Sequence, residues 1–268
     1  QAASALISVS KWHFEGKVVL ITGASSGIGC GTAQLFSKEG AKVAISGRNE
    51  ERLRETLGKC KAPTSGRSHL IIVGDVTNED DAQKIINNTI AHFGQLDVLV
   101  NNAGILETGS IEETSLEQYD RVMNTNVRSL YHLTMLAVPH LIKTKGNIVN
   151  VSSVAGTRSF PNILSYCMSK SAVDQFTKCT ALELAPKQVR VNAVNPGVIV
   201  TDIHKRGGMD DKAYAEFLER GKATHALGRV GSVDEVADGI VFLASDKASF
   251  ITGANLPICG GRHVMCPR

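Results

Sequence analysis

Short apolar runs alternate with longer segments of helical periodicity along most of the chain. Runs rich in Val, Ile and Leu begin near Val18, Val43, Leu70, Leu96, Gly146 and Val189. Continuous apolar runs of this length are typical of strands that are buried on both faces. Because strands that alternate with helices form parallel sheets, the pattern predicts an α/β fold. We therefore expect one domain built on a doubly wound parallel β-sheet with helices on both faces.

A glycine-rich turn follows the first of these strands. The run Lys17–Thr22 leads into Gly23-Ala-Ser-Ser-Gly-Ile-Gly29, and helical periodicity starts at Cys30. This order of strand, turn and helix is typical of a Rossmann-type dinucleotide-binding loop. Gly23 would permit the tight turn, Gly27 would let backbone approach a pyrophosphate, and Gly29 would let the helix pack close to the strand. The N–H groups at the helix start would bind the phosphates.

The other members of the loop are candidates for cofactor contact as well, namely Ser25, Ser26 and Ile28. The alternative interpretation is a structural turn whose glycines are incidental. The position of the turn between a strand and a helix favours the cofactor loop.

The end of the second strand predicts which dinucleotide is bound. The strand Lys42–Ser46 is followed by Gly47 and Arg48, about 20 residues beyond the loop. At this place an acidic residue binds the ribose 2′-hydroxyl of NAD(H), whereas an arginine accepts the 2′-phosphate of NADP(H). Arg48 therefore predicts NADP(H) as the preferred cofactor, with NAD(H) as the alternative. Arg48 as an ordinary surface charge stays open at this point.

Tyr166 and Lys170 are spaced for a proton-transfer site. They stand four residues apart in a helical segment, so they share one face, and Ser153 precedes the tyrosine by thirteen residues. A free phenol has a pKa of about 10. A cation nearby favours the phenolate, so we expect Lys170 to lower the pKa of Tyr166. Because helices carry this spacing by chance, a packing role for Tyr166 is the alternative.

With these motifs in order, the chain resembles the short-chain dehydrogenase/reductase family. The resemblance runs from about Gly16 to Gly261 and rests on Thr22-Gly-Ala-Ser-Ser-Gly-Ile-Gly29, Asp75-Val76, Asn101-Asn-Ala-Gly104, Asn126, Ser153, Tyr166 with Lys170, and Pro196-Gly197. The chain looks like the single-domain members, which include β-ketoacyl carrier-protein reductases, carbonyl reductases and hydroxysteroid dehydrogenases. The resemblance implies an enzyme that interconverts a ketone or aldehyde with an alcohol by hydride transfer.

The resemblance also implies a role for each matching residue. Asp75 and Val76 would contact the adenine. Asn102, Ala103 and Gly104 would border the cofactor. The nicotinamide would lie along a segment whose contacts are Pro196, Gly197, Ile199 and Thr201.

The same resemblance assigns the chemistry. Tyr166 would act as general acid and base, and Ser153 would donate a hydrogen bond to the carbonyl oxygen. Lys170 would also hold the nicotinamide ribose, and Asn126 would position a water that links Lys170 to solvent. Two positions depart from the pattern. Cys259 stands where an acid often precedes the final Gly-Gly, and Ser26 is not the basic residue that NADPH-preferring members often carry.

The substrate pocket is expected beside this site. We expect it to be framed by Val154, Ala155, Phe160, Leu164 and a lid over 202–227, with Ser153 and Tyr166 at its reactive end. Gly207 and Gly208 would be the lid's hinge. The lid's large side chains favour a medium or bulky apolar ketone, namely Met209, Tyr214, Phe217 and Leu218. An ordinary surface helical hairpin is the alternative.

Composition bounds the remaining possibilities. The chain has 268 residues and 43% hydrophobic content, which is enough for one large core. Its net charge of +3 is too small to indicate nucleic-acid or membrane binding. Six dispersed cysteines fit the cytoplasm. The eight histidines show no metal-ligand spacing, so no metal site is expected. We expect a flexible segment over 1–14, the catalytic domain over 15–262 and a tail over 263–268.

The resemblance further implies a homotetramer, or a homodimer, in which the segments 126–142 and 165–184 pack against their symmetry mates. Two other functions stay open at this point. A cofactor-sensing protein without turnover would usually lack Tyr166 or Lys170, and both are present. A nucleotide-sugar epimerase or dehydratase would normally be longer, with a substantial C-terminal substrate domain.

Overall fold

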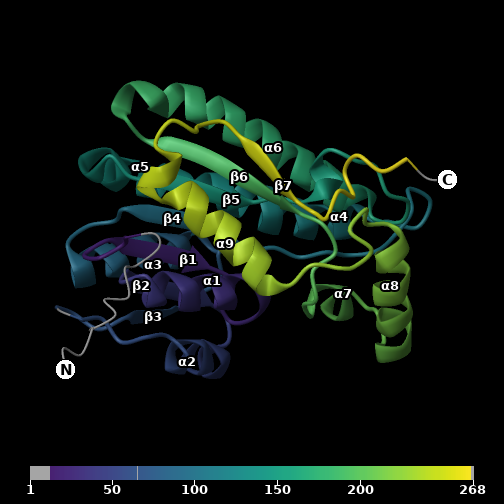
Figure 1. The fold of residues 1–268 in the computed structure, drawn as a ribbon, viewed down its shortest axis with the longest axis horizontal. Coiled ribbons are helices and arrows are strands. Elements are labelled where there is room, and N and C mark those ends of the chain that lie inside the picture. Colours follow the sequence, from purple (N-terminus) through teal and green to yellow (C-terminus); the bar gives the residue numbers. More distant parts are fainter. Residues whose placement is uncertain (1–12, 65, 267–268) are drawn as a thin grey trace, which may run out of the picture.

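Seven parallel strands form the centre of the molecule (Figure 1). The structure is a computed structural model that describes residues 13–64 and 66–266. The strand order is β3-β2-β1-β4-β5-β6-β7. The strands are β1 (Val18–Thr22), β2 (Lys42–Gly47), β3 (Leu70–Val73), β4 (Val98–Asn101), β5 (Asn147–Val151), β6 (Arg190–Pro196) and β7 (Asn255–Ile258).

Helices cover both faces of this sheet. The helices of the described residues are α1 (Gly27–Lys38), α2 (Glu50–Gly58), α3 (Glu79–Phe93), α4 (Leu116–Met123), α5 (Ser129–Thr144), α6 (Leu164–Leu184), α7 (Ile203–Arg206), α8 (Asp211–Ala223) and α9 (Val233–Ala244), of which α7 and α8 lie beyond the end of the sheet (Figure 1). Short turns are the π-helical η1 (Asn124–Arg128) and the 3₁₀ turns η2 (Val154–Gly156), η3 (Ala185–Lys187) and η4 (Asp246–Ala248).

Side chains that alternate along each strand divide the core into two layers. Val19 and Ile21 of β1 pack into the cluster that holds Phe36 of α1 and Val236 of α9. Val18 and Leu20 point to the other face, whose cluster takes in residues of α3, α5 and α6. The layers explain why the strands are apolar throughout, since both faces of each strand are covered.

The order of the strands places the functional site. The chain runs outward from β1 through β2 to β3, and then returns to β4 on the other side of β1. In open sheets of this kind, ligands bind beyond the carboxyl ends of the strands where the order reverses. The loops after β1 and β4 meet at this point.

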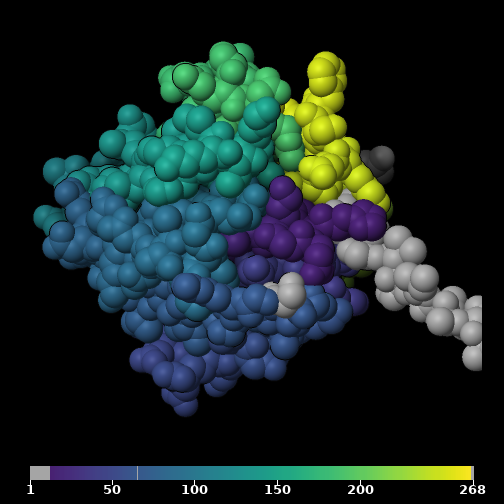
Figure 2. Space-filling model, turned by 90° about the vertical axis from the view of Figure 1, so that its left-hand side faces the viewer, coloured from purple at the N-terminus to yellow at the C-terminus, as the bar shows by residue number. Residues whose placement is uncertain are grey.

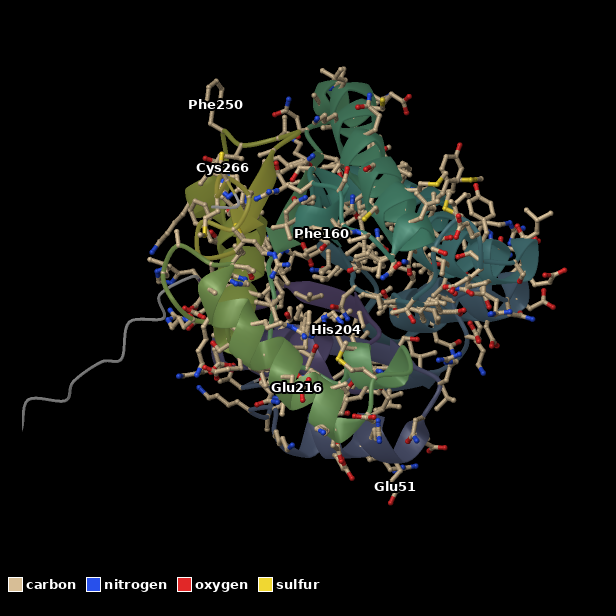
Figure 3. All side chains as sticks on the ribbon, turned by 90° about the vertical axis from the view of Figure 1, so that its right-hand side faces the viewer. Glu51, Phe160, His204, Glu216, Phe250 and Cys266 are labelled. Carbon is tan, nitrogen blue, oxygen red and sulfur yellow. The ribbon has the colours of Figure 1, made fainter. Side chains whose placement is uncertain are left out.

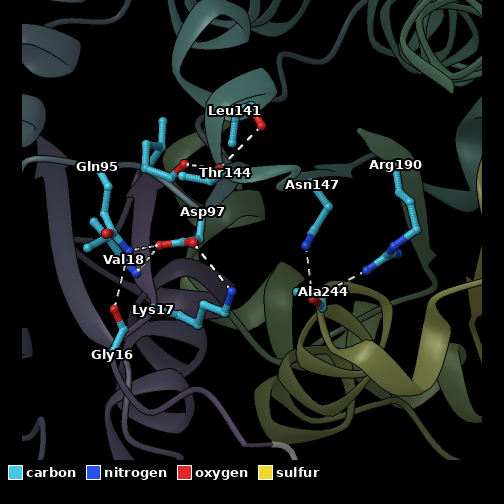
Figure 4. A network of polar contacts seen from close by, with 11 residues as sticks. Gly16, Lys17, Val18, Gln95, Asp97, Leu141, Thr144, Asn147, Arg190 and Ala244 are labelled. Atoms are coloured by element: carbon cyan, nitrogen blue, oxygen red, sulfur yellow. Dashed lines mark hydrogen bonds and ion pairs between the residues drawn. The ribbon is translucent and has the colours of Figure 1, made fainter. Parts of the chain in front are cut away.

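The opposite end of the sheet is closed by a polar network (Figure 4). The buried carboxylate of Asp97 accepts hydrogen bonds from the N–H of Val18 at 2.8 Å and from Gln95 Nε2 at 2.7 Å. Asn147 Nδ2 donates to the carbonyl of Ala244 at 2.9 Å. In the view of this end, the earliest described residues (purple) lie between the middle of the chain (blue to teal) and a segment from late in the chain (yellow) (Figure 2).

The expected fold is confirmed, with local differences. Six strands lie where the apolar runs place them, within two residues. The seventh, β7, has no comparable signal, because it is short, half-exposed and interrupted by Pro257, which is typical of an edge strand. The helix expected from residue 126 begins as the π-helical turn η1 and becomes α-helical only at Ser129.

The N-terminal boundary differs from the expected one. Residues 1–12 of the expected flexible segment lie outside the described residues. Phe14, however, is buried and packs edge-on against Phe36, with ring centroids 4.9 Å apart. Its N–H donates to the carbonyl of Glu39 at 3.1 Å. The packed domain therefore includes Phe14 rather than starting at residue 15.

Candidate active site

One cavity of about 1100 Å³ opens at the carboxyl ends of the strands. Its wall includes nearly all the residues that the sequence singles out for cofactor or substrate, namely Gly23, Ser25, Ser26, Gly27, Ile28, Arg48, Asp75, Val76, Asn102, Ala103, Gly104, Ser153, Ala155, Phe160, Tyr166, Lys170, Pro196, Gly197, Ile199 and Thr201. Gly29 and Asn126 lie behind this wall, and Leu164 does not line it either. The cavity therefore joins positions that are far apart in the sequence.

The glycine loop is held by close contacts against the segment that follows β4. Gly23 has a φ of +63°, and a Cβ there would lie 2.8 Å from Ala103 Cα. A Cβ at Gly29 would lie 2.5 Å from Asn102 Nδ2 and 2.6 Å from the carbonyl oxygen of Gly23. Asn102 Nδ2 in turn donates to the carbonyls of Thr22 at 2.9 Å and Gly23 at 3.0 Å. Glycine is needed at both positions because neighbouring atoms occupy the space of a side chain.

This loop fits a dinucleotide. Helix α1 begins at Gly27, so its free N–H groups face the cavity, where phosphates are stabilised. The loop's neighbour on the other side is Thr201, whose Cγ2 would lie 3.2 Å from a Cβ at Gly27. Thr201 is fixed by Tyr214 of α8, whose hydroxyl donates to the carbonyl of Thr201 at 2.9 Å. The residues present therefore offer the cradle that a pyrophosphate needs.

Arg48 lies at the end of the cavity beyond β2. Its side chain is 74% exposed, and Nη1 lies 3.7 Å from a carboxylate oxygen of Asp75. Burial acts to raise the pKa of Asp75, but hydrogen bonds from Thr77 and the charge of Arg48 hold this pKa below its usual range. Arg48 is thus a cation on the cavity wall with most of its surface open to a ligand.

Tyr166 and Lys170 meet as the helical spacing predicts. Both lie on α6 and are buried, and the Lys170 ammonium lies 5.6 Å from the centre of the Tyr166 ring. Lys170 Nζ donates to the carbonyl of Val151 at 2.8 Å. Burial raises the pKa of Tyr166 to about 12 and lowers that of Lys170 to about 8.

The expected lowering of the Tyr166 pKa is therefore wrong for this structure. Burial removes the phenol from water and so raises its pKa. The hydrogen bond with Ser153 lowers this pKa, but by less than burial raises it. The phenol carries its proton at neutral pH. It is consequently in the form that donates a proton, as reduction of a carbonyl requires.

Two adjacent serines follow β5, and their contacts differ. The hydroxyl of Ser152 donates to the carbonyl of Lys170 at 3.1 Å, which ties it to α6. Ser153 caps the turn η2, where its oxygen accepts from the N–H of Ala155 at 3.1 Å, and it contacts the Tyr166 phenol. Ser153 is thus the serine that shares the reactive end of the cavity with Tyr166.

Asn126 lies in the π-helical turn η1, beneath the cavity wall. Its Oδ1 accepts from the N–H of Ile105 at 2.8 Å, and its Nδ2 donates to the carbonyl of Ile105 at 2.9 Å and to Ser169 Oγ at 3.0 Å. The amide therefore fixes the loop after β4 against α6. A π-helical turn inside a longer helix often marks a functional site.

Asp174 belongs to the same helical face and was missed by the sequence analysis. It follows Lys170 by four residues, is buried, and accepts from Asn195 Nδ2 at 3.0 Å. Burial raises the pKa of Asp174, while hydrogen bonds from Ser152 and Asn195 and the charge of Lys170 oppose this. Continuing the spacing of four from Tyr166 through Lys170 would have identified it.

The comparisons with known proteins agree with this site. A family model described as "Enoyl-(Acyl carrier protein) reductase" matches residues 23–263. A 3-oxoacyl-[acyl-carrier-protein] reductase of Thermotoga maritima is 40% identical over 250 residues, which cover 93% of this chain and 98% of the relative. A meso-2,3-butanediol dehydrogenase of Serratia marcescens is 37% identical over 249 residues, covering 93% and 95%.

A crystal structure of a short-chain dehydrogenase/reductase of unknown function from Caenorhabditis elegans, with cofactor, superposes with a TM-score of 0.87. It is 39% identical, and the match covers 94% of this chain and 97% of that one. This chain belongs to the short-chain dehydrogenase/reductase family. As a member, it is an NAD(P)-dependent oxidoreductase acting on CH–OH groups or the corresponding carbonyls.

In this short-chain dehydrogenase/reductase, the end of the cavity next to Tyr166 is apolar. Leu106, Ala155 and Tyr166 form a buried cluster against which Phe160 and Ile203 pack. Phe160 and His204 lie near the middle of the face that looks into the cavity (Figure 3). Burial, and then the charge of Arg262, lowers the pKa of His204 to about 4, so its ring is neutral at pH 7.

The segment 202–227, which is expected to form a lid, contains two helices, α7 and α8, joined through Gly207 and Gly208. Met209 and Phe217 reach the cavity wall, as expected, whereas Leu218 does not line it and Tyr214 is buried against Thr201. Arg262 was not expected here. Its guanidinium lies 4.9 Å from the centre of the Phe160 ring and donates to Thr224 Oγ1 at 2.9 Å. The mobility of the lid stays a prediction.

The remaining expectations concern groups outside the cavity. Across residues 13–64 and 66–266, no group of three or more His, Cys, Asp or Glu is placed to hold a metal ion. Cys259 is buried, with its sulfur 3.1 Å from His263 Nδ1, in agreement with a structural role. Within the same described ranges, no helix is both long and apolar enough to span a membrane.

Proposed function

We propose that this enzyme reduces a medium or bulky apolar ketone or aldehyde with NADPH, using Tyr166 as the proton donor. One observation carries the proposal. A protonated, buried phenol lies beside Ser153 and Lys170 in the same cavity as the glycine loop, with the apolar cluster of Leu106 and Phe160 next to it. A steroid-like, β-ketoacyl or xenobiotic carbonyl would fit such a wall.

The residues divide the work as follows. When bound, the cofactor supplies the hydride. Tyr166 holds the proton that passes to the carbonyl oxygen, and Ser153 donates a hydrogen bond to that oxygen as negative charge develops on it. Lys170 keeps a positive charge close to the phenol, 5.6 Å from the centre of its ring, and would hold the nicotinamide ribose. Asn126 fixes Ile105 and Ser169 around this centre and, by our proposal, positions a water through which the proton is replaced.

Arg48 supports NADPH over NADH. Its guanidinium is exposed on the cavity wall at the end of β2, where a 2′-phosphate would lie. A sensor without turnover gains no support, since the relatives named above are a reductase and a dehydrogenase and all of Ser153, Tyr166 and Lys170 are present.

The proposed function is tested by following the oxidation of NADPH and NADH by absorbance with a panel of diketones, ketosteroids, β-ketoacyl thioesters and retinal. We expect turnover of at least one apolar ketone, and a lower KM for NADPH than for NADH. The panel also includes an oxo acid and its methyl ester. These two compounds differ by one negative charge, and the Arg262 cation lies at the substrate end. If no member of the panel oxidised either cofactor, a carbonyl reductase would be the wrong assignment.

The pH dependence of reduction should follow Lys170. Its pKa of about 8 leaves it charged below pH 8, where it stabilises the negative charge that Tyr166 acquires on losing its proton. Above pH 8 this charge is lost, so kcat/KM for the ketone should fall about tenfold per pH unit. Tyr166 stays protonated throughout, because its pKa is about 12. A profile measured from about pH 6 to 10 at saturating NADPH checks this, and a rate that rises above pH 8 would contradict it.

We also propose that α5 and α6 form the interface of a homotetramer or homodimer. Four large side chains on these helices are about half-exposed or more, namely Tyr131, Met135, Met168 and Leu182. Apolar groups gathered on one surface typically mark an interface. A monomeric mass by light scattering would contradict this assembly. The six free cysteines fit the reducing cytoplasm, where we propose that the enzyme works.

A further inference from the structure

A cation from the lid contacts the glycine loop. Arg206 is the last residue of α7, and its Nη1 donates to Ser26 Oγ at 3.0 Å. Both residues line the cavity, although they are 180 positions apart in the sequence. The hydrogen bond directly joins the lid to the loop that would hold the cofactor phosphates. Neither residue's sequence context predicts it.

Like charges gather around this contact. Partial burial lowers the pKa of Arg206, Asp202 opposes the change, and the charges of Arg52 and Arg48 lower this pKa further. Arg48 lies on the same cavity wall, and its Nη1 forms an ion pair with a carboxylate oxygen of Asp75 at 3.7 Å. None of the ion pairs of the described residues includes Arg206, and Asp202 is the carboxylate whose charge acts on it. The local excess of positive charge is unfavourable without a bound anion.

We propose that Arg206 and Arg48 together bind the 2′-phosphate of NADP(H), with Ser26 between them. The lid would then supply a specificity determinant for the cofactor as well as a wall for the substrate. This inference rests on the proposed preference for NADPH. Guanidinium groups suit the role because their fork of N–H donors matches the oxygens of a phosphate.

The position of the two arginines explains why the 2′-phosphate is the group to expect. Arg48 follows β2, which is the place where the adenosine ribose of a dinucleotide is recognised. Arg206 reaches the same end of the loop at Ser26, on the side of Arg48 and Arg52. Ser26 carries no charge of its own, so it can accept from Arg206 while leaving the guanidinium's other N–H groups for the ligand.

The test measures cofactor binding, without turnover. Dissociation constants for NADPH and NADH are obtained by titrating the fluorescence of the reduced nicotinamide with the wild type, Arg206→Ala and Lys212→Ala. We expect Arg206→Ala to weaken NADPH binding at least about 10-fold, since it removes charge-assisted hydrogen bonds, and to change NADH binding less than about threefold. Lys212 is the matched control, because it is an exposed cation of the same lid that does not line the cavity.

Two further variants separate charge from geometry. Arg206→Lys keeps the positive charge but loses the fork, so part of the preference for NADPH should remain. Ser26→Arg in the Arg206→Ala background places a guanidinium on the loop itself, and it should restore NADPH binding at least about threefold. Circular dichroism confirms that each variant is folded.

The outcomes distinguish this inference from the proposed preference for NADPH on which it rests. If the wild type bound NADH as tightly as NADPH, the proposed cofactor preference would be wrong, and the role of Arg206 with it. If the wild type preferred NADPH and Arg206→Ala kept that preference, only the role of Arg206 would be overturned. Equal weakening of both cofactors would place Arg206 on the shared pyrophosphate, and this would also overturn the inference.

Discussion

Replacing Tyr166 with Phe should lower kcat for ketone reduction about 10²–10⁴-fold, the usual contribution of a positioned general acid. Only the hydroxyl is lost, and the ring keeps its place in the buried cluster with Leu106 and Ala155. The proton that the proposal draws from the phenol then has no source at that position, and Lys170, whose ammonium lies 5.6 Å from the centre of the ring, does not take the place of the hydroxyl. NADPH binding should stay within about threefold of the wild type, because the variant leaves the glycine loop intact.

The matched control is Tyr119→Phe. Tyr119 lies on α4 and does not line the cavity, so removal of its hydroxyl should leave kcat unchanged. The measurements are kcat with the best ketone of the panel and the dissociation constant of NADPH. Activity of Tyr166→Phe within about tenfold of the wild type would show that another group donates the proton, and the assignment of Tyr166 would have to be withdrawn.

The sequence was sufficient for those parts of the molecule that are set by local spacing. The apolar runs located six strands because a strand that is buried on both faces is apolar at nearly every position and therefore appears as a continuous run. The glycine loop could be recognised because its glycines follow a strand and precede a helix. Tyr166 and Lys170 meet because a helix brings residues four apart onto one face.

Contacts between distant segments could not be predicted in the same way. Arg206 meets Ser26, and Arg262 covers Phe160, only because the lid and the C-terminal segment fold back over the cavity. Nothing in the spacing of these residues signals the contact. The short edge strand β7 was missed for a related reason, since it is defined by its pairing with β6 rather than by an apolar run of its own.

The pKa of Tyr166 shows a different limit of prediction from sequence. The sequence places a cation four residues away, and this alone argues for a lowered pKa. The opposite direction is found because both groups are buried, and the cost of removing a phenolate from water depends on the whole fold. A pKa shift that is predicted from the spacing of two residues must therefore be weighed against the effect of burial, which the spacing does not reveal.

Gly29→Ala should weaken NADPH binding about 100-fold, because a single methyl group there overpacks the loop. The added Cβ would lie 2.5 Å from Asn102 Nδ2 and 2.6 Å from the carbonyl oxygen of Gly23. These two atoms are hydrogen-bonded to each other at 3.0 Å, so the methyl group intrudes on the bond that joins the loop to the residue after β4. The Gly23 oxygen is backbone and can move only if the turn moves, which displaces the N–H groups that face the phosphates.

Gly58→Ala is the control for this variant, since a Cβ at the end of α2 meets nothing within 4 Å. It should leave NADPH binding unchanged and raise the free energy of unfolding by about 0.4–1 kcal/mol, as the unfolded chain loses freedom. Nicotinamide fluorescence gives the affinities, and thermal unfolding separates loss of binding from loss of fold. A folded Gly29→Ala protein with wild-type affinity would mean that the loop tolerates the displacement. The close contact of Gly29 with Gly23 and Asn102 would then not be what shapes the phosphate site.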